Sequence, residues 1–412
     1  MVRTIGWMLS CFVLVLCLTI PAMAETLTVW VGDGTVRLAE YQVVADLFEK
    51  QNPGLKVDLQ LQSGSQAQIM DKLMLAIAAG APPDVTWFEG SAVIEFAAQG
   101  LLTEVTNAVR GLKFTPADVV EMTYAGKMWA VPYHTAVRGL FKNVDIFEEV
   151  GLNPNIDPVS LDEMYEWNKK MVKQNPDGSY SRAGMVPWVG NWGAPAWIWT
   201  FGGELIETVG DVIRPTATNP KNIEAFRWIR TWAQFYGTSS PVTAGWTGLA
   251  NGTVGMTPGS SSEVARILEA GTSFTTGRVP HPPGGRNGTW GGGTAVAVPA
   301  GVKNVDLALK LARFFGETEV QIQRFLSPAG VVLPANWDAL MTVGRQLDQR
   351  LWGPLLDQFP EARPRTPLWI EYYVNQLNPA MNAVVNGSKT PEKALEDVQL
   401  VMQERFADIF GK

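Results

Sequence analysis

The stretch Gly126–Pro154, GKMWAVPYHTAVRGLFKNVDIFEEVGLNP, decides how the chain is organised. It begins with a short apolar run, Met128–Val131, which Pro132 closes, and the polar and aromatic segment Tyr133–Thr135 follows. Apolar residues then return and lead into a predicted helix over Asp145–Val150. A strand, a proline with a fixed φ and a new strand–helix unit predict a passage between two lobes.

Length and composition agree with two lobes. The chain has 412 residues, which is long for one core, and it is 46% hydrophobic and 18% charged, as expected of a folded globular protein. Its formal net charge is −7, and Lys and Arg form no runs. We therefore expect no nucleic-acid surface.

Residues 1–24 predict a cleavable secretory signal peptide. Arg3 gives a positive start, Trp7–Ile20 is apolar, and Ala22–Ala24 is a small-residue cleavage site. The alternative is an uncleaved membrane anchor, for which the apolar run is short. Leu16 in front of Cys17 argues against a lipid anchor. We expect a periplasmic or secreted protein.

Both cysteines, Cys11 and Cys17, lie inside this predicted signal. The mature chain then has no disulfide and no thiolate chemistry, so its core must hold it together.

Three predicted strands alternate with amphipathic helices over the first hundred residues. The strands are Thr26–Trp30, Val57–Leu61 and Asp84–Phe88. This order predicts a largely parallel sheet covered by helices. Such sheets bind ligands outside the carboxyl ends of their strands. The segments to examine there are Asp33–Thr35, Ser63–Gln66 and Glu89–Ser91.

Farther along, Pro187–Leu205 contains several tryptophans among glycines and a proline, and we expect it to be loop-like. Helices are predicted over 221–236, 305–316 and most of 368–410, and a buried strand over Thr294–Pro299.

The chain resembles an extracellular solute-binding protein of an ABC importer, in the group that binds sugars and related solutes. The residues that carry the resemblance run through the whole mature chain. They include Leu27–Trp30, Lys72–Asp84, Gly126–Pro132, Phe141–Leu152, Phe201–Leu205, Asn251–Met256, Gly292–Pro299 and Asn386–Leu395. At Phe141-Lys142-Asn143 and Val159-Ser160-Leu161 the chain departs from the family's usual tyrosine-asparagine and threonine-tryptophan pairs, which weakens any transfer of ligand identity.

The resemblance implies an α/β fold of the two-lobe, periplasmic-binding-protein-like kind (type II). The chain would cross the hinge more than once, with the ligand in a cleft between the lobes. The lobes would comprise residues 25–132 plus 293–326, and 133–292 plus 327–412. The expected partners are a sugar-like small molecule and the membrane permease of the importer, and we expect a monomer.

Sugars have apolar C–H faces, which aromatic rings cover, and a rim of hydroxyls, which polar side chains bind. Trp188, Trp192 and Trp197 are candidates for ring contacts because loops around a cleft often carry binding residues. The alternative for each ring is packing in the core.

The strand ends supply a second group of candidates. Trp87 and Glu89 follow the third predicted strand, and Gln66 follows the second. Asp33, after the first strand, either binds hydroxyls or caps the next helix.

His134 and Arg138 lie just past the predicted crossing. His134 either contacts the ligand or is structural, and Arg138 either binds ligand or pairs with a carboxylate. Gly259, before a helix, offers backbone N–H groups for an anion or is an ordinary helix start. The segment with Trp290 and Gly292 either lets the backbone approach a ligand closely or is a flexible connection that returns the chain to the first lobe. Trp369 is a further candidate for ligand contact.

The sequence contains few residue patterns typical of an active site. Two distant histidines argue against common zinc clusters, and no phosphate loop or nucleophile elbow is present. We expect no catalytic residue, metal or cofactor. One alternative is a secreted carbohydrate-active enzyme, because a chain with 40 acidic residues always permits some pair of catalytic carboxylates. The other is a binding protein for a polyol or glycerophosphodiester.

Overall fold

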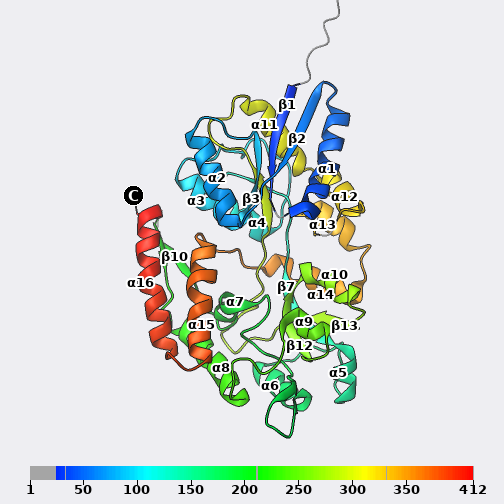
Figure 1. The fold of residues 1–412 in the computed structure, drawn as a ribbon, viewed down its shortest axis with the longest axis vertical. Helices are drawn as coiled ribbons and strands as arrows, with labels where there is room; N and C mark the ends of the chain where they lie inside the picture. The colour runs from blue at the N-terminus through cyan, green and yellow to red at the C-terminus, as the bar shows by residue number, and fades with distance from the viewer. Residues whose placement is uncertain (1–24, 33, 210–211, 331, 412) are drawn as a thin grey trace, which may run out of the picture.

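The computed structural model describes residues 25–32, 34–209, 212–330 and 332–411. Two α/β lobes lie one above the other in Figure 1. The predicted signal peptide and Asp33 fall outside the described residues. None of the helices in the described ranges is long and apolar enough to cross a membrane.

The upper lobe is built on a five-stranded sheet in the order β2-β1-β3-β14-β6. The first three strands run parallel, as predicted, whereas β14 runs antiparallel to both of its neighbours. Every residue of β3 and β14 is buried because helices cover both faces of the sheet centre. The strands are β1 (Glu25–Val31), β2 (Leu55–Leu61), β3 (Val85–Glu89), β6 (Val131–Pro132) and β14 (Thr294–Ala297).

The lower lobe has an antiparallel sheet in the order β12-β7-β13. Three hairpins complete the strands: β4 with β5, β8 with β9, and β10 with β11. Their bounds are β4 (Thr123–Tyr124), β5 (Lys127–Met128), β7 (Arg138–Asn143), β8 (Lys173–Gln174), β9 (Tyr180–Arg182), β10 (Ile206–Val209), β11 (Val212–Pro215), β12 (Met256–Ser260) and β13 (Phe274–Gly277).

Helices account for most of the remaining chain. Those of the first half are α1 (Gly34–Gln51), α2 (Gln66–Ala78), η1 (Gly90–Ala92), α3 (Val93–Ala98), α4 (Pro116–Glu121), α5 (Val144–Glu149), α6 (Leu161–Met171) and α7 (Gly193–Thr200). Those of the second half are α8 (Pro220–Tyr236), α9 (Gly245–Ala250), η2 (Ser261–Glu263), α10 (Val264–Glu269), α11 (Val305–Phe315), α12 (Thr318–Leu326), α13 (Trp337–Gly344), α14 (Gln349–Leu356), η3 (Phe359–Glu361), η4 (Ile370–Leu377), α15 (Asn378–Val385) and α16 (Pro391–Phe410).

Two separate hydrophobic cores underlie the two lobes. The upper core draws its side chains from 27–133, 295–320 and Ala335, and the lower core from 137–290 and 333–410 with Ala117. The chain therefore passes between the cores near 134–136, 291–294 and 321–332. These three passages of the chain form the hinge region between the lobes.

The stretch 126–154 contains the first passage. Its apolar run is split into β5 and β6, and Pro132 is the last residue of β6 instead of lying beyond a strand, paired with Ala295. A proline fits there because β6 is an edge strand with one unpaired side. The predicted strand–helix unit that follows is confirmed as β7 and α5.

The expectation of a loop over Pro187–Leu205 is wrong for its second half, where α7 is a buried helix. All eight residues of α7 are buried, so the segment is apolar on every side and shows no amphipathic period. Pro195 lies in the first turn, where a missing N–H costs no helical hydrogen bond.

Candidate ligand-binding cleft

A cleft of about 420 Å³ lies between the two lobes. Its upper wall comes from α2, β3, η1 and α3, and its lower wall from the segment around η4 and the last turns of α16. The lining residues are Gln66, Ala67, Met70, Asp71, Met74, Glu89, Ser91, Ala92, Glu95, Phe96, Leu368, Trp369, Ile370, Glu371, Asn375, Arg405, Asp408 and Ile409. Gln66, Glu89 and Trp369 are among the residues that the sequence predicts for the site.

Gln66 and Glu89 meet where two strand–helix units present their ends. Glu89 is the last residue of β3, and Gln66 is the first residue of α2, which Ser65 caps through a capping box with Gln68. Gln66 Nε2 donates a hydrogen bond of 2.7 Å to Glu89 Oε2. The capped helix thus fixes the amide beside the carboxylate.

Arg365 from the lower lobe closes the floor of the cleft against this pair. Its guanidinium donates to Glu89 and, through Nε and Nη2, to both oxygens of Glu121 at 2.9 and 2.7 Å. Nη2 also donates to the carbonyl of Gly293 at 2.6 Å. All three charged side chains are buried, so their charges depend on one another for compensation.

The protonation of this network follows from burial. Burial raises the pKa of Glu121, although the contacts with Arg365 oppose the shift. Burial and, to a smaller extent, the charge of Glu121 together raise the pKa of neighbouring Asp118 to about 7. Burial alone would lower the pKa of Arg365, but Glu121 and Glu89 together raise it. Arg365 is therefore held as a cation.

Gly292 belongs to the same network. Its φ is +100°, and a Cβ at this position would collide with the carboxylate of Glu121. Glycine is needed because the backbone must approach a buried carboxylate closely. The structure places Gly292 against a protein side chain at the floor of the cleft.

Behind Trp369, aromatic rings extend the lower wall into the lobe. Trp369 lies 5.1 Å from the ring of Trp290 and 4.9 Å from that of Tyr373, and Arg138 stacks on Trp290 with its guanidinium carbon 3.2 Å from the ring centre. Arg138 also donates to Asn191 Oδ1 at 3.3 Å. Burial lowers the pKa of Arg138 to about 9, and nearby Arg365 adds to the effect.

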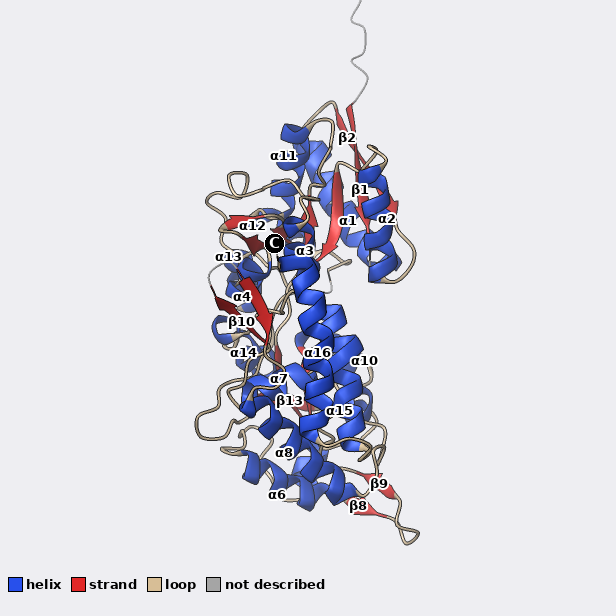
Figure 2. Cartoon of the chain, turned by 90° about the vertical axis from the view of Figure 1, so that its left-hand side faces the viewer, coloured by secondary structure: helices blue, strands red, loops and turns tan. Residues whose placement is uncertain are grey.

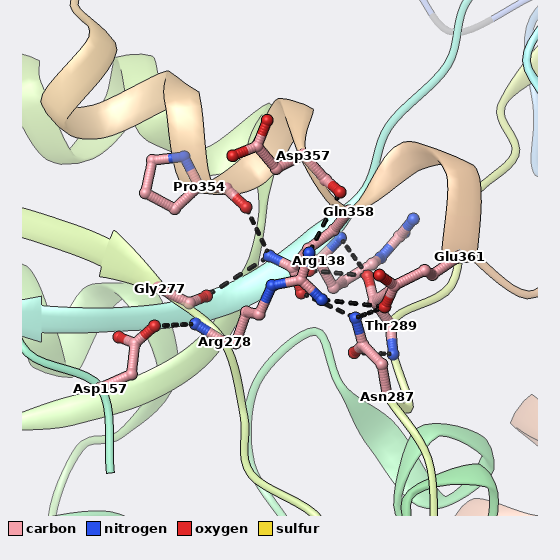
Figure 3. A network of polar contacts seen from close by, with 10 residues as sticks. All are labelled: Arg138, Asp157, Gly277, Arg278, Asn287, Thr289, Pro354, Asp357, Gln358 and Glu361. Carbon is pink, nitrogen blue, oxygen red and sulfur yellow. Dashed lines mark hydrogen bonds and ion pairs between the residues drawn. The ribbon is translucent and has the colours of Figure 1, made fainter. Parts of the chain in front are cut away.

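Figure 3 shows the polar network around Arg138, the residue whose guanidinium stacks on Trp290. Thr289 Oγ1 donates to the carbonyl of Arg138 at 2.7 Å, and Asn287 donates to Glu361 at 3.1 Å. Arg278 pairs with the same Glu361 at 2.8 Å. These contacts link β7, η3 and the residue that follows β13 to Asn287 and Thr289, which precede Trp290 in the chain.

Trp188, Trp192 and Trp197 are buried in the lower core. Trp188 and Trp197 donate through Nε1 to the carbonyls of Ser239 and Pro187 at 2.8 and 2.7 Å. Trp192 instead accepts, through its carbonyl, a hydrogen bond of 3.2 Å from Trp290 Nε1. The three rings thus lie in the core and outside the residues that line the cleft.

Three other predicted residues also lie away from the lining. His134 is buried in the upper core, with Nε2 3.0 Å from Glu40 Oε2 and Nδ1 2.8 Å from Thr294 Oγ1. Trp87 is buried against Gly32, and Gly259 packs on Phe141 and Glu263.

Several charged residues of the cleft lining and of the network beneath it were not predicted from the sequence. Glu121 and Arg365 are 244 positions apart, and no local pattern connects them. Glu95, Glu371 and Arg405 occupy helices where they look like ordinary solvent-facing charges. Only the packing of the lobes brings them to one cleft.

No three His, Cys, Asp or Glu side chains group as a metal site in the part of the chain that the structure describes.

Comparison with known proteins identifies a family and similar solved structures. The profile of the bacterial extracellular solute-binding protein family matches residues 32–322. A maltooligosaccharide ABC transporter solute-binding lipoprotein of Streptococcus pneumoniae is 23% identical over 411 residues, 94% of this chain and 90% of the relative. An sn-glycerol-3-phosphate-binding periplasmic protein of Brucella abortus is 22% identical over 279 residues, 63% of this chain and 64% of the relative. The solved structure of CpMnBP1 with mannobiose bound superposes with a TM-score of 0.75 at 21% identity, and covers 92% of this chain and 99% of that one.

Proposed function

Because the chain belongs to the bacterial extracellular solute-binding proteins, we propose that it is the solute-binding component of an ABC importer and binds a sugar or oligosaccharide between its lobes. The observation that carries the proposal is the interlobe cleft, which places the Trp369 ring opposite the carboxylates and amide of the upper wall. The proposed lobes are residues 25–132 plus 293–326, and 133–292 plus 327–412, with Tyr133, His134 and Ala335 packed on the upper core at the boundary.

The lining suits the two surfaces of a sugar. Trp369, Phe96 and the methionines Met70 and Met74 offer apolar surface for C–H faces. Gln66 and Glu89 offer hydrogen-bonding groups for hydroxyls, and bonds to a carboxylate are the stronger ones.

The charge of the lining favours a neutral ligand over an anionic one. The lining contains the five acidic residues Asp71, Glu89, Glu95, Glu371 and Asp408, against the single basic residue Arg405. Buried Arg365 offsets one of these charges by pairing with Glu89. Like charges repel at this range, so a phosphate group would enter at a cost.

In this function the protein is exported, binds its solute outside the cytoplasm, closes about the hinge and presents the complex to the membrane permease. It acts as a monomer and catalyses no reaction of its ligand. The signal peptide at 1–24, cleaved without lipidation, directs the export.

A thermal-shift screen over neutral sugars, polyols and glycerophosphodiesters tests the proposal. A bound ligand stabilises the folded state by mass action, so a neutral mono- or oligosaccharide should raise the melting temperature. A response confined to anionic compounds would overturn the neutral-sugar proposal, and turnover of an oligosaccharide would show an enzyme instead.

The residues of the cleft give a sharper version of this test. Trp369→Ala removes the ring of the lower wall, and we expect it to weaken sugar affinity about tenfold, the change that a loss of about 1.4 kcal/mol of binding free energy produces. Trp246→Ala, on α9 and outside the lining, is the matched control. Equal affinities for the two variants would place the ligand elsewhere.

A further inference from the structure

Helix α16 belongs to the lower lobe but does not end there. It packs on α8, α15 and η4 of that lobe, and its far end contacts α3 of the upper lobe. Figure 2 shows it running up the side of the molecule to the level of α3. A single straight helix therefore spans the boundary between the lobes.

Phe410 forms the contact with the upper lobe. It is 6% exposed, and its ring lies 6.5 Å from that of Tyr124 on β4 and 5.6 Å from that of Phe406 one turn earlier. Ile94 and Ala98 of α3 pack against the same apolar cluster. Phe410 thus joins the last turn of α16 to upper-lobe side chains, while Ala407 and Asp408 of the same turn remain exposed.

The same turn also lines the cleft. Arg405, Asp408 and Ile409 face the space that Met74 and Phe96 bound from the upper lobe. Residues three and four apart lie on one face of a helix, so the turn can line the cleft with one side while Phe410 packs on the other lobe.

We propose that the last turn of α16 is an interlobe strap, anchored on Tyr124 by Phe410, that limits how fast the ligand leaves the cleft. The proposal rests on the proposed function, because it assumes a ligand in this cleft. When the lobes separate, the Phe410 contact must break or the turn must move with the upper lobe. Its loss therefore shifts the population toward open lobes and speeds release.

Phe410→Ala tests the strap. Release of a saccharide identified by the thermal-shift screen is followed by stopped-flow tryptophan fluorescence. We expect release about tenfold faster, the change that about 1.4 kcal/mol of lost interlobe contact produces. Leu400→Ala, on the exposed face of the same helix with Leu400 60% exposed, should release ligand as the unaltered protein does.

A second measurement needs no ligand. Spin labels at Val159→Cys in the lower lobe and Val305→Cys in the upper lobe report the distance between the lobes, since both positions are exposed and the two natural cysteines lie in the predicted signal peptide. Phe410→Ala should shift the distances toward longer values. Tyr124→Ala should do the same, and the double variant should add little, because both changes remove one contact.

Unchanged release and unchanged lobe distances in Phe410→Ala would overturn the strap. If that variant does not fold, Tyr124→Ala alone decides between the same outcomes. If the unaltered protein binds no sugar, the proposed function fails, while the distances in the ligand-free protein still support or overturn the strap.

Discussion

At the residue scale, Arg365 balances the charge at the floor of the cleft, because it pairs with two buried carboxylates, Glu89 and Glu121. Arg365→Met should destabilise the protein by about 3–5 kcal/mol, as expected when one partner of a buried ion pair is removed. Urea unfolding monitored by circular dichroism measures this loss. A variant as stable as the unaltered protein would contradict the account.

The pH dependence of that variant follows from Glu121. Burial already raises its folded pKa above the ordinary 4.5, and removing the cation raises it further. A carboxyl with a raised folded pKa destabilises increasingly as the pH rises above the unfolded value. The stability deficit of Arg365→Met should therefore be smaller at pH 4.5 than at pH 7.

His134 gives a prediction of the opposite sign. Burial lowers its folded pKa from 6.5 to about 4, so between these values the unfolded state binds the proton and the folded state does not. Lowering the pH from 6.5 to 4 should cost up to about 3 kcal/mol of stability through this group. Urea unfolding between pH 4 and 6.5 measures this loss, and His134→Gln should give a flatter stability profile over that range than the unaltered protein.

The location of His134 also shows what sequence reasoning could and could not reach. The sequence predicted that it either contacts the ligand or is structural, and the structure places it beside Glu40 on α1, which is 94 positions earlier and faces it only after the upper lobe folds. The pairing of Arg365 with Glu121 is equally non-local. Strand ends, by contrast, are local, and they led directly to Gln66 and Glu89.

At the element scale, the strand and helix order of the first hundred residues was predictable because its periodicity and stop signals are local. The parallel order β2-β1-β3 is confirmed. The antiparallel insertion of β14 between β3 and β6 was not predicted, since it depends on a return of the chain some 160 residues later. Helix α7 was missed because burial on every side removes the amphipathic signal.

The N-cap of α2 gives the element-scale prediction. Ser65→Ala removes the capping bond to the N–H of Gln68 and should cost about 1 kcal/mol of stability. It should also weaken sugar affinity, because Gln66 begins the helix and reaches Glu89. Ser160→Ala removes the equivalent cap of α6, outside the cleft lining, and should cost similar stability without loss of affinity. Equal affinity losses in the two variants would contradict a role for the α2 cap in binding.

At the scale of the whole molecule, the central claim is that two lobes with separate cores bind a neutral saccharide in the acidic, aromatic cleft between them. Isothermal titration of the purified protein with maltotriose, mannobiose and sn-glycerol 3-phosphate tests it most directly. The account predicts saturable binding of one saccharide per chain, lost or strongly weakened in Trp369→Ala, and no binding of the phosphate. Saturable binding of the phosphate without binding of either saccharide would contradict it.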